Sequence, residues 1–137
     1  MADQPEPFPG VFPGTIGAPP DVPALVTASD LVCVARVRER RESGRVRYLV
    51  NGEAVEFQRI SATVDVERAV EGTAYEQIEV ELLGLDEPSG LARLEEGERV
   101  LLFLVRRDER YTLTDLVTGA VDLGRPGADE VLARLEP

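Results

Sequence analysis

The sequence predicts an all-β fold with a minor helical part, in which five long, curved, antiparallel strands close into a small Greek-key barrel. Successive runs of the chain alternate apolar and polar residues, which is the period of a half-buried strand. Asn51 and Gly52 separate two such runs and tolerate the positive φ angles of a tight hairpin turn. The apolar face then changes parity near Gln58 and Arg59, as a β-bulge or sharp bend in one long strand would produce. A β-sandwich is the main alternative, but it usually has about seven strands.

The chain of 137 residues predicts one domain with an appendage at each end. Seven of its ten prolines fall within the first 23 residues, and proline excludes both a helix interior and a central strand. We expect a Pro/Gly-rich arm over 1–20, extended and polyproline-like, which is either free or anchored on the barrel by Phe8, Phe12 and Ile16. The barrel domain then occupies 21–125, and 126–137 form a tail or a short helix.

The first half of the domain opens with a short helix over 22–28, because Asp21 offers an N-cap and Pro23 lies in the first turn. A strand over 31–38 begins with apolar residues on both faces and ends with arginines on one, so it starts buried and becomes exposed. The hairpin strands follow at 45–50 and 53–57. Beyond the parity change, apolar residues at even positions from Ile60 to Val66 continue the second of these strands.

The second half predicts three further strands. Residues 78–82 alternate regularly, whereas 100–105 are apolar on both faces, which is typical of a central strand. Residues 111–115 form the last regular strand, and 120–123 add a short edge piece. A loop over 86–90 and a turn at 95–97 separate these runs, and 129–135 can form one or two closing helical turns.

Charge argues against nucleic acid and anionic lipid as partners. All 15 basic residues are arginines, and 26 Asp and Glu residues bring the formal net charge to −11. No run of about 18 apolar residues is present, so we expect no membrane span. The first residues also lack the basic and apolar regions of a signal peptide, so the protein is either cytoplasmic or exported with its signal removed.

One basic cluster opposes this acidic background. Six arginines and two glutamates between 36 and 47 give this segment a charge of +4. The interpretation that we favour for the cluster itself is a solvated, twisted hairpin whose charges keep an exposed edge soluble. The alternative is a docking patch for an acidic partner. The candidate partner-binding residues are Arg38, Arg40, Arg45, Arg47, Tyr48 and Arg59.

The sequence predicts no catalytic site, no metal site and no cofactor. Without any His, a Ser-His-Asp or Cys-His relay cannot be assembled, and Cys33 is the only cysteine. Cys33 lies between two valines, which favours a small core residue over a nucleophile. The acidic runs at 86–87 and 95–98 match no calcium motif and are typical of solvated turns. The glycines of the arm do not join a strand to a helix, so they give no phosphate loop.

Three stretches resemble the netrin-like, or tissue-inhibitor-of-metalloproteinase-like, variant of the OB-fold that small bacterial proteins carry. They are ASDLVCVARV (28–37), VDVERAVEG (64–72) and LEEGERVLLFL (94–104), within a region of resemblance over 24–121. The resemblance implies an OB-like barrel and, if a signal peptide has been removed, an exported or envelope setting. Animal members chelate a protease zinc through an N-terminal Cys and carry disulfides. Neither feature applies to this sequence, because residue 1 is Met and Cys33 is its only cysteine.

The leading hypothesis is therefore a non-enzymatic binding or accessory module that engages a protein partner through the arginine-rich hairpin. The alternative is an OB domain that binds single-stranded nucleic acid, which would need aromatic side chains beside a basic groove. Tyr48 and Phe57 near the arginines are the only match to that pattern. The oligomeric state is not predicted.

Overall fold

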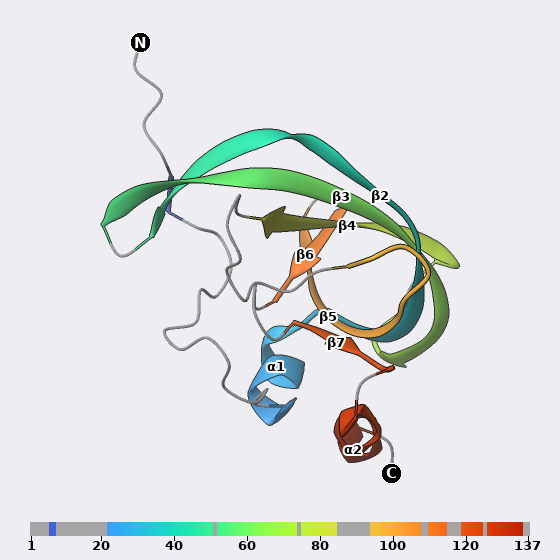
Figure 1. Ribbon diagram of the computed structural model, residues 1–137. Coiled ribbons are helices and arrows are strands. Elements are labelled where there is room, and N and C mark those ends of the chain that lie inside the picture. The colour runs from blue at the N-terminus through green and yellow to red at the C-terminus, as the bar shows by residue number, and fades with distance from the viewer. Residues whose placement is uncertain are drawn as a thin grey trace.

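The computed structural model of the chain describes residues 6–7, 22–50, 52–73, 75–84, 94–107, 110–114, 119–124 and 126–135. The chain folds mostly into strands, and Figure 1 shows them curling around a common centre with two short helices beside them. The elements in order are β1 (Glu6–Pro7), α1 (Val22–Ala28), β2 (Leu31–Val50), β3 (Glu53–Glu71), β4 (Gln77–Gly84), β5 (Arg99–Arg107), β6 (Arg110–Leu113), β7 (Ala120–Asp122) and α2 (Ala128–Leu135).

Five of these strands form a closed ring. β2 pairs with β3, β3 with β4, β4 with β6, β6 with β5, and β5 returns to β2. The predicted number of ring strands is confirmed, but a wholly antiparallel ring is wrong, because β4 and β6 pair in parallel. Two short strands extend the sheet outside the ring: β1 lies parallel to β2, and β7 lies antiparallel to β5.

The predicted helix over 22–28 and the strands β4 and β5 are confirmed. The two separate strands expected at 31–38 and 45–50 are instead one continuous strand, β2. The intervening glycine and charged residues do not break β2, because β3 stays paired with it from Val32 to Val50. Within the arm, the described residues Glu6 and Pro7 form β1, whereas the proposed anchors Phe8, Phe12 and Ile16 lie outside the described residues. The loop expected over 86–90 also lies outside them.

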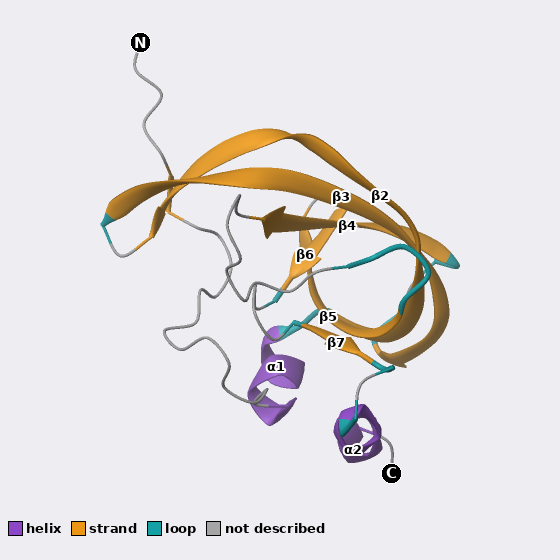
Figure 2. Ribbon diagram, viewed as in Figure 1, coloured by secondary structure: helices purple, strands orange, loops and turns teal. Residues whose placement is uncertain are grey.

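The ring encloses one hydrophobic core. Alternate residues of β2, β3, β4 and β5 point into it, including Cys33, Ala62, Val80 and Leu102, each of which is fully buried. We call this side of the sheet the inner face and the opposite side the outer face. A second core lies on the outer face of β2 and β5, where Val34 and Phe103 pack with apolar residues of both helices. Figure 2 shows α1 and α2 on the same side of the ring.

Bulges curl the long β2–β3 pair. The register shifts at four points, and two of the shifts place an extra residue in β2, at Arg38 and at Ser43. The shift at Ser43 lies next to Arg59, where the sequence predicted a bulge or bend, but the extra residue belongs to β2 and not to β3. β3 continues regularly there, so Phe57 and Ile60 are buried on opposite faces. The change of apolar parity marks the point where the hairpin leaves the ring.

Candidate functional site: the arginine-rich hairpin

The paired ends of β2 and β3 extend beyond the ring, as Figure 1 shows. β5 pairs with β2 only over 31–36, and β4 pairs with β3 only over 58–65. Over 45–57 the described pairings of β2 and β3 are with each other, apart from β1 at Tyr48 and Leu49. We call residues 45–57 the projecting hairpin. Gly52 closes it with a φ of 83°, a conformation that glycine adopts without steric cost.

The strand register divides the projecting hairpin into two faces. Arg45 pairs with Gln58 and Arg47 with Glu56, on the face that continues the inner face of the ring. The other face carries Val46, Tyr48, Val55 and Phe57, with the charged Glu53 on the same face near the turn. The rings of Tyr48 and Phe57 are 6.2 Å apart, and Phe57 is fully buried. The hairpin therefore presents its cations mainly on one side.

The six candidate residues do not form one patch. Arg40, Arg45 and Arg47 share the inner face, because the extra residue Ser43 preserves their alternation across the bulge. Tyr48 and Arg59 lie on the outer face. Arg38 occupies the first bulge of β2 and forms an ion pair with Asp65, with 3.7 Å between the guanidinium Nη1 and the carboxylate Oδ1.

Acidic side chains pair with several of the arginines. Arg45 Nη1 lies 3.3 Å from Glu56 Oε1, and Arg41 Nη2 lies 2.8 Å from Glu79 Oε1. Arg59 Nε donates to Glu81 Oε1 at 2.9 Å. These pairs lower the charge that the cluster offers to a partner, and they make the +4 of the sequence segment an overestimate.

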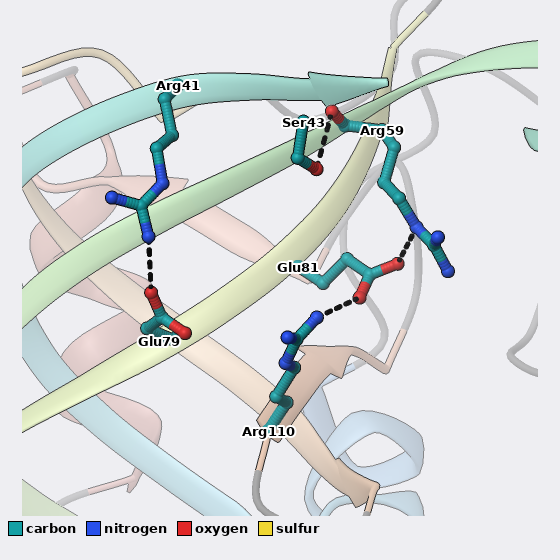
Figure 3. Close-up of polar contacts among 6 residues, drawn as sticks. All are labelled: Arg41, Ser43, Arg59, Glu79, Glu81 and Arg110. Carbon is teal, nitrogen blue, oxygen red and sulfur yellow. Dashed lines mark hydrogen bonds and ion pairs between the residues drawn. The ribbon is translucent and has the colours of Figure 1, made fainter. Parts of the chain in front are cut away.

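Glu81 is the centre of a small network on the outer face of the sheet, drawn in Figure 3. Its second oxygen, Oε2, lies 3.8 Å from Nη1 of Arg110 on β6, so one carboxylate joins three strands. The hydrogen bond and charge of Glu81 raise the pKa of Arg59 above its ordinary value, and Tyr48 contributes further. The sequence prediction missed Glu79, Glu81 and Arg110, although their regular alternation already placed the two glutamates on one outward face.

Two of the candidate arginines have no acidic partner among the described residues: Arg40 and Arg47. Arg47 is exposed. The Nε of Arg40 is buried and forms no hydrogen bond within the described part of the chain, while its backbone N–H donates to Glu96 Oε1 at 3.3 Å. A buried donor without an acceptor is rare.

Two further titratable groups with shifted pKa values, Cys33 and Glu98, lie outside the projecting hairpin. Cys33 is buried in the ring core, as predicted, and burial raises the pKa of its thiol to about 12. Glu98 follows the turn at Gly97, and burial beside Asp122 raises the pKa of its carboxyl. Within the described residues, no three His, Cys, Asp or Glu side chains converge as metal ligands would.

Neither described helix is long and apolar enough to cross a membrane. Comparison with models of known protein families finds no match to this chain, and a search among curated proteins finds none either.

Proposed function

We propose that this protein is a non-enzymatic binding or accessory module, built on an OB-like barrel of the netrin-like type, which engages a protein partner through the arginine-rich hairpin. The strand order supports the barrel part of this proposal. β2, β3 and β4 are neighbours in chain order, and β5 lies beside β2. A Greek key places its fourth strand beside its first in the same way.

The single observation that carries the binding proposal is the projecting hairpin itself. Its residues leave the ring and have two strand edges that little of the described chain covers. It also holds Arg47, a cation without an acidic partner among the described residues, and Arg40 lies on the same face nearby. A long element that contributes little to the ring core has room to serve recognition, and exposed arginines are favoured at protein interfaces.

The same observations favour protein over single-stranded nucleic acid. On the outer face of β3 and β4, four acidic residues pair with arginines, so this face offers little net positive charge to phosphate; they are Asp65, Glu67, Glu79 and Glu81. Stacking on bases also needs an open aromatic ring, and Phe57 and Phe103 are fully buried. Tyr75 is exposed, but it lies in the turn between β3 and β4, beside Glu76.

The test is a pull-down from an extract of the source organism with the full chain and its Arg40→Glu/Arg47→Glu variant. These two positions have no acidic partner among the described residues, so reversing them breaks no described ion pair. An Arg68→Glu/Arg106→Glu variant makes the same change in net charge outside the hairpin. We expect the wild type and the control to enrich a partner and the hairpin variant to lose it, with thermal melts verifying that all three fold.

Unchanged capture by the folded hairpin variant contradicts the proposed site. Equal loss from both variants shows that overall charge, rather than the hairpin, governs capture. A wild-type chain that enriches nothing above an empty resin contradicts the binding-module proposal itself.

A further inference from the structure

We propose that the edge of β2 over residues 41–47 binds an extended, acidic segment of a partner protein by strand addition. This inference rests on the proposed function, because it names the chemistry of the segment that the hairpin engages. Strand addition uses main-chain hydrogen bonds to a free sheet edge for affinity, and it uses alternate side chains for specificity.

Within the described part of the chain, this edge carries no strand between two paired stretches of β2. On one side, β5 pairs as far as Arg36, and Val37 exchanges hydrogen bonds with the turn before β5, accepting from Gly97 N at 2.8 Å and donating to Glu98 O at 2.9 Å. On the other side, β1 begins opposite Tyr48. No described residue adds a strand over 41–47, although β3 pairs with this stretch from the opposite side at every residue except the bulged Ser43.

The chain itself shows that this edge accepts a strand. Glu6 lies opposite Tyr48 and Pro7 opposite Leu49, and both run parallel to β2. β1 covers only two residues, and Pro7 has no N–H to donate. A partner segment continuing the line of β1 would meet residues 41–47 of β2 already paired with β3, with one bulge at Ser43.

Side-chain spacing gives the acidic preference. Arg40, Glu42, Arg45 and Arg47 occupy successive same-face positions of β2, because the bulge at Ser43 absorbs one residue. Same-face neighbours on a strand lie about 7 Å apart, so an added strand presents its own alternate side chains at the matching interval. Carboxylates at every second position would therefore face three arginines and one glutamate, and two of these arginines, Arg40 and Arg47, have no described acidic partner.

The same arginines exclude the most obvious competitor. If two copies of this chain paired through β2, each would place an arginine-rich edge against the other, and like charges directly opposite each other destabilise a sheet. Arginines and a bulge are also common protections of an exposed edge. These protections repel basic or neutral edges far more than an acidic one, so the edge selects its partner by charge.

The test uses a synthetic peptide of about eight residues, a typical strand length, that alternates Glu and Thr. Fluorescence anisotropy with the full chain measures its affinity, and backbone hydrogen exchange locates it. We expect slowed exchange over residues 41–47. N-methylation of every second peptide nitrogen keeps the charge but removes edge hydrogen bonds, and we expect it to weaken binding by roughly ten-fold. A Lys-Thr peptide should not bind.

The double variant Arg40→Gln/Arg47→Gln should lower the affinity for the acidic peptide by roughly ten-fold as well. The control Arg68→Gln/Arg106→Gln should leave this affinity unchanged. The single variant Arg47→Gln is measured as well, because replacing an exposed side chain should leave the fold intact. Equal binding by the N-methylated peptide overturns strand addition in favour of charge alone. If the acidic peptide fails to bind while the pull-down still depends on the hairpin, this inference falls and the proposed function stands; if both fail, both fall.

Discussion

Neutralising Glu81 tests whether the arginines of the sheet are engaged within the protein. Its side chain is 17% exposed, and it contacts the guanidinium groups of Arg59 at 2.9 Å and Arg110 at 3.8 Å. An exposed ion pair contributes about 0.2–1 kcal/mol, and a short charge-assisted hydrogen bond with a half-buried partner lies at the upper end of that range or above it. We expect Glu81→Gln to lower the free energy of unfolding by about 1 kcal/mol, because the amide keeps the shape but loses the charge.

The matched control is Glu79→Gln, two residues earlier on the same face of β4. Glu79 is 40% exposed and forms its ion pair with Arg41, which is 56% exposed, so solvent screens this pair more strongly. We expect Glu79→Gln to cost about half as much as Glu81→Gln, or less. Figure 3 shows both carboxylates and their partners.

Urea denaturation at low salt measures both effects, and the difference should shrink at about 1 M salt, where the Debye length is roughly 3 Å. For a domain of this size, 1 kcal/mol corresponds to a melting shift of about 3–5 °C. A cost for Glu79→Gln that equals or exceeds that of Glu81→Gln would refute the reasoning, as would a loss at Glu81 that is insensitive to salt. Either result would mean that burial and charge pairing do not determine which of the two glutamates contributes more to stability.

Three further predictions concern positions outside the hairpin. Cys33 should react with thiol reagents only as fast as the protein unfolds, since burial raises its thiol pKa to about 12; Cys33→Ser should cost about 1–3 kcal/mol by burying an unpaired hydroxyl. Gly72→Ala should destabilise by about 1–3 kcal/mol more than Gly52→Ala in urea melts. Both glycines have a φ of 83°, but only at Gly72 does an added Cβ meet a backbone oxygen, Asp30 O, at 2.7 Å. Burial and the nearby carboxylate of Asp122 on β7 raise the folded-state pKa of Glu98, so ionised Glu98 lowers stability at neutral pH and protonation removes this cost as the pH falls. We therefore expect Glu98→Gln to raise the melting temperature at neutral pH. A gain of the same size at about pH 4 would contradict this explanation.

Local signals predicted the elements whose conformation depends on near neighbours. Pro23 lies in the first turn of α1, and Gly52 closes the β2–β3 hairpin with a positive φ. The alternation in β4 placed Val80 inside the ring and Glu81 outside it. In each case the deciding interaction spans only a few residues, so the sequence period and turn chemistry were sufficient.

The contacts of the candidate site depend on the register between paired strands, which could not be predicted from the sequence. Arg59 and Glu81 are 22 residues apart in the chain, and only the β3–β4 pairing brings them together. The parallel pairing of β4 with β6 is likewise a consequence of ring closure. The continuity of β2 through Gly44 was missed for the same reason, because pairing with β3 overrides the weak strand preference of glycine.

Register also changes what the arginine cluster means. Counted along the chain, its six arginines form one basic segment, but counted across the sheet most of them face acids on β3 or β4. Only Arg40 and Arg47 keep a cation without a described acidic partner, and they lie on one face of β2, along an edge that no described strand covers over 41–47. Recognition by this hairpin would therefore depend on two placed charges and a line of backbone groups rather than on bulk positive potential. Salt should weaken such binding only moderately, whereas blocking the backbone of the partner strand should weaken it by roughly ten-fold.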